Sequence, residues 1–151
     1  NGSVVAETES SVSVVAGQKS DISHTMNISS PELWDIENPY LYSLVTEIIK
    51  DGKCIDRYTT ITGVRDFKFD AEKGFILNGK QTKINGVCMH HDLGCLGAAV
   101  NTRAIERQLQ ILKEMGCNGI RCSHNPPAPE LLDLCDKMGF IVMDEAFDMW
   151  R

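Results

Sequence analysis

The stretch that decides the fold is residues 118–145, NGIRCSHNPPAPELLDLCDKMGFIVMDE. It reads as a short strand over 118–122, a helix that begins near Pro129 and stops at Gly139, and a continuously apolar strand over 140–143. Pro favours the first helical turn, Gly ends helices, and an apolar strand without alternation is typical of a sheet covered on both faces. The stretch therefore predicts a strand–helix–strand unit of a parallel sheet.

The same pattern begins upstream. Residues 84–89 read as a strand, and a helix follows with Thr102 as a plausible N-cap and Gly116 as its stop. One face of that helix carries apolar residues at helical spacing: Ile105, Leu109, Leu112 and Met115. Right-handed βαβ crossovers would place all three strands in one parallel sheet.

Residues 1–65 have a different periodicity. Alternating or apolar stretches predict short strands over 11–16, 21–28, 41–49 and 54–62, and Asp51-Gly52 is a hairpin-turn signal. Such strands without a helical pattern indicate part of an antiparallel, Ig-like β-sandwich. Fewer strands are visible than a whole Ig-like sandwich has, so we expect a missing N-terminal portion.

Residues 66–82 read as a β-hairpin with its turn at Asn78-Gly79. The expected organisation is therefore a partial sandwich over 1–65, this lead-in hairpin over 66–82, and the first three βα units of a (β/α)8 TIM barrel over 83–151.

Polar residues gather directly after each strand of the barrel portion. The ends of consecutive parallel strands meet on one face, which in a (β/α)8 barrel is the active-site face. The candidate site residues are His90, His91 and Asp92 after the first strand, Arg121, His124 and Asn125 at the second, and Asp144 and Glu145 after the third.

Arg121 lies among apolar neighbours, so its guanidinium needs a partner. It would form a structural salt bridge with Asp144 or Glu145, or orient a catalytic carboxylate or a substrate hydroxyl. His124 and Asn125 precede two prolines that stiffen their loop, which suits hydrogen bonding to sugar hydroxyls or simple capping of the loop.

Adjacent residues on an extended segment point in opposite directions. His90 and His91 therefore cannot both ligate one metal ion without a bend, and we expect no metal site; at least one binds a ligand, or both are structural. For the same reason Asp144 and Glu145 are not the carboxylate pair that glycoside hydrolysis needs, and we assign them a supporting role.

Two tryptophans have separate expectations. Trp34 should pack within the sandwich, and Trp150 should either stack on a sugar ring or cover the barrel rim.

Composition narrows the class of protein. The 151 residues are 42% hydrophobic and 24% charged, as in a folded domain, and the net charge of −6 argues against nucleic-acid or anionic-membrane partners. No apolar run reaches the roughly 20 residues of a membrane span, and no signal peptide is visible. The first residue is Asn1, so we expect the true start, and the true end, to lie outside this chain. The six cysteines are expected to be reduced core thiols, and they do not fix the cellular compartment.

Several motifs, in order along the chain, resemble glycoside hydrolase family 2. Residues 118–126 (NGIRCSHNP) and 139–145 (GFIVMDE) are similar to the first signature of the family. Upstream, 38–42 (NPYLY) and 75–80 (FILNGK) resemble the end of its Ig-like domain and the lead into its barrel. Residues 84–92 (INGVCMHHD) resemble its first barrel strand.

The resemblance implies a fragment of a retaining exo-glycosidase. The family contains β-galactosidases, β-glucuronidases and β-mannosidases, and its common His-Tyr-Pro is His124-Asn125-Pro126 here, a variant associated with β-galactosidase-like members. Terminal β-D-galactosides are therefore the expected substrate, with β-glucuronidase specificity as the alternative.

The same resemblance implies site roles. His124 matches the histidine that lines the sugar site, Arg121 matches an arginine that contacts the nucleophile carboxylate in related barrels, and residues 90–92 match a polar cluster near the pocket. The acid/base and nucleophile glutamates would lie beyond Arg151. The chain would thus hold no catalytic residue and would be inactive by itself.

The resemblance also implies which partners and cofactors to expect. A carbohydrate is the expected substrate, and no cofactor is expected in this segment; use of Mg or Na, and homo-oligomerisation, stay open for the full-length protein. Two other classes compete: a non-catalytic carbohydrate-binding module formed by residues 1–65, and another (β/α)8 enzyme such as a lyase or aldolase.

Overall fold

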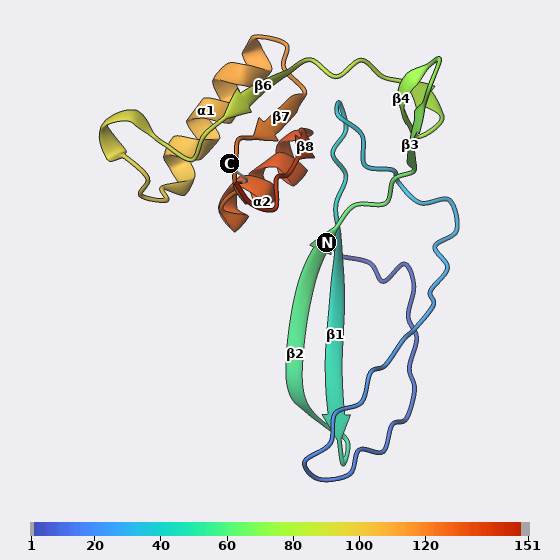
Figure 1. Cartoon of the computed structure of the whole chain (residues 1–151). Coiled ribbons are helices and arrows are strands. Elements are labelled where there is room, and N and C mark those ends of the chain that lie inside the picture. Colours follow the sequence, from blue (N-terminus) through green and yellow to red (C-terminus); the bar gives the residue numbers. More distant parts are fainter. Residues whose placement is uncertain (1, 149–151) are drawn as a thin grey trace. The chain divides into compact units, whose positions relative to one another are not determined.

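The computed structural model describes residues 2–148, and the chain divides into two units, residues 1–32 and 33–151 (Figure 1). Within residues 2–32 the backbone forms no helix or strand, so the predicted strands over 11–16 and 21–28 are wrong. Apolar side chains there, such as Val12 and Ile22, are 51% and 55% exposed. Alternating residues become a strand only when a neighbouring backbone takes up their hydrogen bonds, and the described residues provide none for this segment.

The second unit begins with a long hairpin. β1 (Tyr42–Lys50) pairs antiparallel with β2 (Lys53–Thr62). Asp51 and Gly52 connect them with φ angles of 50° and 73°, as a type I′ turn requires, which confirms the predicted hairpin.

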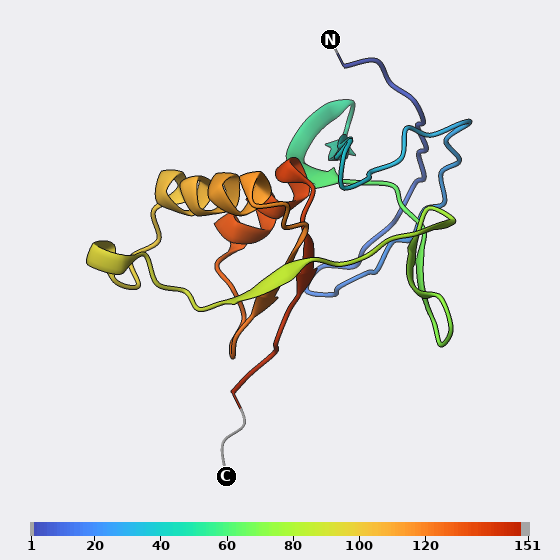
Figure 2. The same cartoon turned by 90° about the horizontal axis from the view of Figure 1, so that it is seen from above.

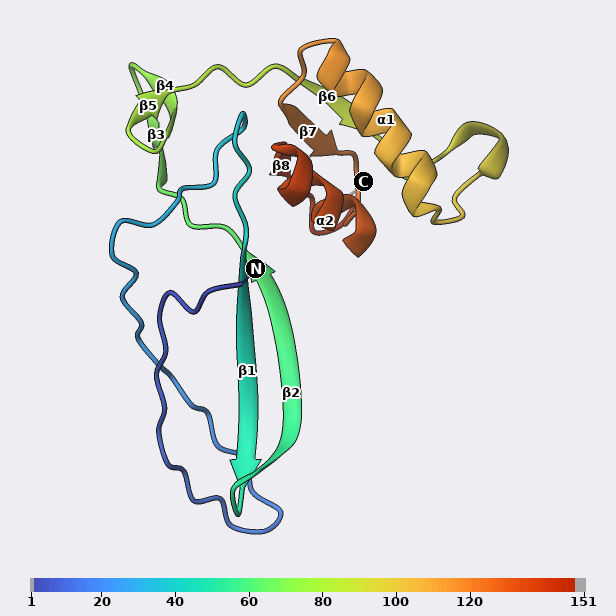
Figure 3. The same ribbon diagram turned by 180° about the vertical axis from the view of Figure 1, so that it is seen from behind.

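A small antiparallel sheet follows, with strand order β3-β4-β5 (Figure 3). It comprises β3 (Phe67–Asp70), β4 (Gly74–Leu77) and β5 (Lys80–Gln81). Asn78 and Gly79 turn β4 into β5 with φ angles of 50° and 78°, so the predicted lead-in hairpin is also confirmed.

The remainder is a βαβαβ unit. The parallel strands β6 (Gly86–Met89), β7 (Gly119–Cys122) and β8 (Ile141–Met143) form one sheet in that order. Between them lie a short 3₁₀ turn (Gly94–Leu96), α1 (Thr102–Glu114) and α2 (Pro129–Met138). Figure 2 shows both helices on the same side of this sheet. The core between the sheet and the helices comprises Ile105, Leu109, Ile120, Cys122, Leu134, Cys135 and Phe140.

Two of the boundaries that differ from the predictions lie where a side chain bonds the backbone. Asn101, not Thr102, caps α1, since its side-chain oxygen accepts the Ala104 N–H at 3.0 Å. The first parallel strand starts at Gly86 rather than Ile84, because the Asn118 side chain bonds the backbone before it, at Asn85 N and Lys83 O.

Trp34 joins the residues before β1 to the barrel portion. It is 2% exposed and packs with Ile36, Phe75 and Leu77, and its indole N–H donates to Asp136 O at 2.7 Å. The expected packing within the sandwich holds only in part: Ile36 lies within residues 1–65, whereas the apolar partners from β4 and the hydrogen-bond acceptor in α2 lie outside it.

The backbone of Ile36 reaches the ends of both helices. Lys113 Nζ donates to Ile36 O at 3.0 Å and to Gly139 O at 3.2 Å. Gly139 ends α2 in the left-handed region, with φ of 75°, and an added Cβ would lie 2.1 Å from Ile36 O. Only glycine allows this approach.

We expect Gly139→Ala to destabilise the full-length protein more than Gly116→Ala. Gly116 follows α1 with φ of 83°, and its added Cβ would meet nothing within 4 Å, so that variant carries only the left-handed penalty of about 1–2 kcal/mol. Thermal unfolding midpoints of the two variants measure the difference. Equal losses would show that the contact with Ile36 is not required.

We also expect the purified 151-residue chain to aggregate or to unfold without cooperativity. Large apolar side chains on β1, β2 and β8 are exposed, including Ile48 at 53%, Ile55 at 61% and Met143 at 63%, and the outer strands of the parallel sheet offer open edges. Light scattering and calorimetry test this; a monomer with one cooperative transition would contradict it.

Candidate active site

The three parallel strands end side by side, so the residues after them lie close together. In the register of the sheet Met89 is opposite Cys122, and Arg121 is opposite Met143. Residues 90–92, 123–125 and 144–145 follow these positions directly. This local geometry follows from the parallel alignment alone.

Three side chains from the second and third strand ends form what we term the strand-tip cluster: Arg121, His124 and Glu145. Arg121 Nη2 and Glu145 Oε1 form an ion pair, and His124 Nδ1 lies 3.1 Å from Glu145 Oε2. One carboxylate thus contacts both other members. The predicted partner of Arg121 is resolved as Glu145 rather than Asp144.

The cluster is partly open. The side chains of Arg121, His124 and Glu145 are 41%, 37% and 22% exposed. At such exposure solvent screens the charges, so the ion pair orients the side chains more than it stabilises the fold.

Cys88 lies next to the cluster, which the sequence interpretation did not foresee. Arg121 Nη1 donates to Cys88 Sγ at 3.7 Å, and this hydrogen bond holds the pKa of the Cys88 thiol below its usual value. Cys88 is opposite Arg121 in the sheet and two residues before His90, so strand alternation could have indicated its position.

The six cysteines divide by burial. All six are free thiols, but Cys54, Cys88 and Cys95 are exposed, so the expectation of core thiols is wrong for them. Cys122 and Cys135 are buried, and burial raises the pKa of the Cys135 thiol to about 12. Cys54 lies on β2, Cys88 on β6 and Cys95 in the 3₁₀ turn, whereas Cys117 is half-buried.

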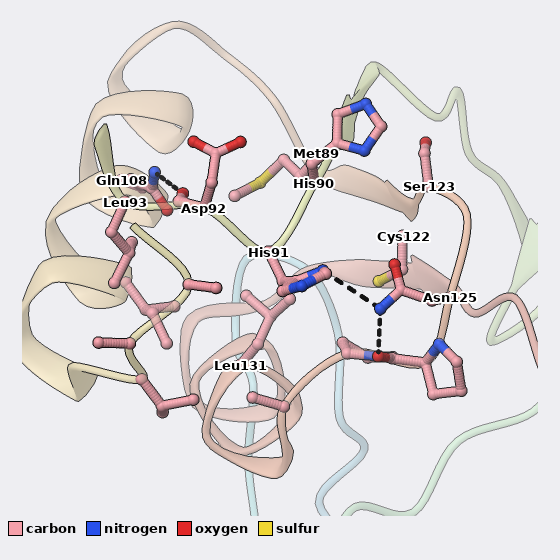
Figure 4. Close-up of a pocket in the computed structure, with 17 residues that line it drawn as sticks. Met89, His90, His91, Asp92, Leu93, Gln108, Cys122, Ser123, Asn125 and Leu131 are labelled. Atoms are coloured by element: carbon pink, nitrogen blue, oxygen red, sulfur yellow. Dashed lines mark hydrogen bonds between the residues drawn. The ribbon is translucent and has the colours of Figure 1, made fainter. Parts of the chain in front are cut away.

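A pocket of about 230 Å³ opens between the loops that follow β6 and β7 (Figure 4). At its centre the side chains of His91 and Asn125 meet, with Nδ1 and Nδ2 3.2 Å apart, and Asn125 Nδ2 also donates to Pro126 O at 3.3 Å. Gln108 Nε2 donates to the backbone oxygen of Asp92 at 3.3 Å. The rest of the lining is mainly apolar, including Leu93, Ala98, Ala99, Val100, Pro127 and Leu131.

The six candidate binding residues therefore fall into two groups. Arg121 and His124 belong to the strand-tip cluster, whereas His91, Asp92 and Asn125 line the pocket. His90 connects the two groups, because it lines the pocket and its ring packs edge-on against that of His124, with centroids 6.0 Å apart. Figure 4 shows the rings of His90 and His91 pointing apart. Their role in binding stays a prediction.

Two further expectations concern Asp144 and Trp150. Asp144 is exposed and takes no part in the cluster. Burial raises the pKa of the Cys122 thiol, and the negative charge of Asp144 raises it further. Trp150 lies outside the described residues.

The part of the chain that the structure describes contains neither a preformed metal site nor a membrane-spanning helix. Residues 2–148 contain no group of three or more His, Cys, Asp or Glu side chains placed to hold a metal ion. In that same range, none of the helices has the length and apolarity needed to cross a membrane.

Comparison with known families covers both parts of the chain. Residues 70–148 match the TIM barrel domain of glycosyl hydrolases family 2, and residues 1–65 match a second domain described as glycosyl hydrolases family 2.

Individual relatives support the same family match. Beta-galactosidase BoGH2A of Bacteroides ovatus is 71% identical over 150 residues, which cover 99% of this chain and 18% of that protein. A beta-glucuronidase of Bacteroides fragilis is 40% identical over 119 residues, covering 78% of this chain and 17% of the relative. The chain thus spans a small part of the length of its relatives.

Solved structures give the same result. A family 2 glycosyl hydrolase from Bacteroides cellulosilyticus superimposes with a TM-score of 0.93 at 47% identity, covering 97% of this chain and 19% of that one.

The pKa of Cys88 provides a test of the cluster. Because Arg121 lowers that pKa, Arg121→Gln should raise it, and the thiolate, the form that reacts, should appear only at higher pH. Alkylation of Cys88 by iodoacetamide in the full-length protein, followed by mass spectrometry across a pH series, should show its midpoint moving upward. Arg103→Gln, which removes a helix-surface ion pair with Glu106, is the matched control. An unchanged midpoint in Arg121→Gln would contradict the contact.

Proposed function

The chain belongs to glycoside hydrolase family 2, and from this premise we propose that the protein of which it forms part is a retaining exo-glycosidase that hydrolyses terminal β-D-galactosides. The observation that carries the proposal is the 71% identity with a relative named beta-galactosidase, over 99% of the chain. Its substrate partner is thus a carbohydrate. The division into a partial sandwich (1–65), a lead-in hairpin (66–82) and the start of the barrel (83–151) is part of the proposal, supported by matches over 1–65 and 70–148.

Within this reaction the segment binds and orients the sugar. Imidazole and amide groups of His90, His91, His124 and Asn125, with the carboxylate of Asp92, would exchange hydrogen bonds with sugar hydroxyls. Arg121 would position a catalytic carboxylate as well as Glu145, since a guanidinium has five N–H donors.

Glu145 is not the acid/base or the nucleophile. A retaining glycosidase needs two carboxylates about 5–5.5 Å apart on either side of the scissile bond. Both oxygens of Glu145 are already engaged, by Arg121 and by His124. The two catalytic carboxylates would therefore come from other parts of the protein.

β-Glucuronidase activity is the second candidate, because relatives of that name are 34–43% identical to this chain. A uronic acid carries a carboxylate, and its binding calls for a cation without an internal partner. The positive charge of Arg121 is balanced by Glu145 within the cluster. The galactoside remains the first candidate because the relative with the higher identity is named beta-galactosidase.

The test is a comparison of two aryl glycosides with the full-length enzyme. We expect hydrolysis of 4-nitrophenyl β-D-galactoside to exceed that of the β-D-glucuronide in kcat/KM by at least about 100-fold, the discrimination that a missing charged partner produces. Proton NMR at early times should show the β-anomer of galactose, as double displacement requires.

The same assay has two informative negative results. Preference for the glucuronide would refute the galactoside specificity, and initial release of the α-anomer would refute retention. The 151-residue chain assayed alone should show no turnover; clear hydrolysis by it would refute the assignment of the catalytic carboxylates to other segments.

A further inference from the structure

The pocket between the loops that follow β6 and β7 has a lining of two kinds. Its polar side chains include His91 and Asn125, which come directly after the strand ends, next to the strand-tip cluster. The rest of the lining is mainly apolar and comes largely from the loop before α1 and from the two helices, including Leu93 and Leu131. Figure 4 shows His90 and Leu131 on opposite sides of the contact between His91 and Asn125. The pocket thus has a polar side and an apolar side.

The apolar side continues the hydrophobic core of the βαβαβ unit. Ile105 and Cys122 line the pocket and belong to that core, and Met89, Leu93 and Leu131 line the pocket and pack against it. Apolar surface gains free energy when it is removed from water, and ligand pockets are typically apolar walls with a few polar groups. This side of the pocket therefore favours an apolar occupant.

The volume of the pocket limits that occupant to about one ring. An apolar cavity of about 150 Å³ in another protein takes up benzene, and this pocket has about 230 Å³. A second sugar unit carries several hydroxyl groups, and each would exchange hydrogen bonds with water for contact with a mainly apolar wall. The pocket therefore fits an aromatic ring with small substituents better than a second sugar unit.

The position of the pocket connects this occupant with the proposed reaction. His90 lines the pocket and packs against His124 of the strand-tip cluster, and Asn125 of the pocket follows His124 directly in the chain. A substrate whose sugar is bound at the cluster therefore has the pocket beside it. We propose that the pocket is the subsite for the aglycone, the group to which the sugar is linked, and that it takes an aromatic aglycone. This inference rests on the proposed glycosidase function.

Thioglycosides measure the binding of the aglycone without the chemistry of the leaving group, because they act as competitive inhibitors and resist hydrolysis. Methyl and phenyl 1-thio-β-D-galactoside are compared as inhibitors of the full-length enzyme. The phenyl compound should bind roughly 10-fold more tightly than the methyl compound, the effect of burying most of one ring. Equal inhibition constants would overturn the proposal.

We expect Ala99→Phe to remove this preference. Ala99 lines the pocket, and the larger side chain would occupy the space that the aglycone ring needs. The ratio of the two inhibition constants should fall from roughly 10 to roughly 1. The matched control is Ala71→Phe, which introduces the same side chain at an exposed position in the turn between β3 and β4 and should keep the wild-type ratio. The same ratio in Ala99→Phe as in Ala71→Phe would contradict the assignment of the pocket.

A second variant, Val100→Ser, covers the case in which Ala99→Phe does not fold. Val100 lines the pocket and is 55% exposed, so its replacement leaves the core intact. A hydroxyl in place of two methyl groups makes the wall more polar, and the ratio should fall roughly 3-fold; an unchanged ratio would overturn the proposal.

The design separates this inference from the proposed function. The thioglycosides are made from whichever sugar the wild type hydrolyses. Preference for glucuronides would therefore refute only the galactoside specificity, whereas a ratio that neither substitution changes would refute only the aglycone subsite.

Discussion

The Arg121 guanidinium sets the constraint on which the site depends. It lies on a strand whose neighbours Ile120 and Cys122 are buried against the helices, and alternation turns it to the opposite face of the sheet. Its side chain is 41% exposed there, and the parallel register brings the next strand close enough for Glu145 to pair with it. One oxygen of the Glu145 carboxylate pairs with Arg121, and the other lies 3.1 Å from His124 Nδ1.

The same parallel alignment creates the neighbouring pocket. The loops that follow β6 and β7 start from adjacent strand ends, so His91 and Asn125 can meet although 34 positions separate them in the sequence. His90 connects the pocket with the strand-tip cluster.

The opposite ends of the helices hold a structural junction. Trp34 and Ile36 bind backbone and side-chain groups at the C-terminal ends of α1 and α2, and Gly139 leaves room for the Ile36 carbonyl. Sequence reasoning placed Trp34 in the sandwich because its nearest strand is there. It could not identify partners 102 positions away, because a tryptophan buries its ring wherever an apolar surface and a hydrogen-bond acceptor coincide.

Local signals were sufficient for the βαβαβ order, both glycine hairpin turns, the helix stops and the convergence of polar residues at strand ends, since each depends on a few neighbouring residues. They failed for the strands over 11–16 and 21–28, which require a partner backbone, and for the cap at Asn101, where adjacent residues compete for one position. The sequence by itself thus determined which side chains reach the strand tips. Only the tertiary structure decided that Glu145 rather than Asp144 pairs with Arg121 and that Cys88 lies beside it, because those choices depend on distances across strands that no residue spacing encodes.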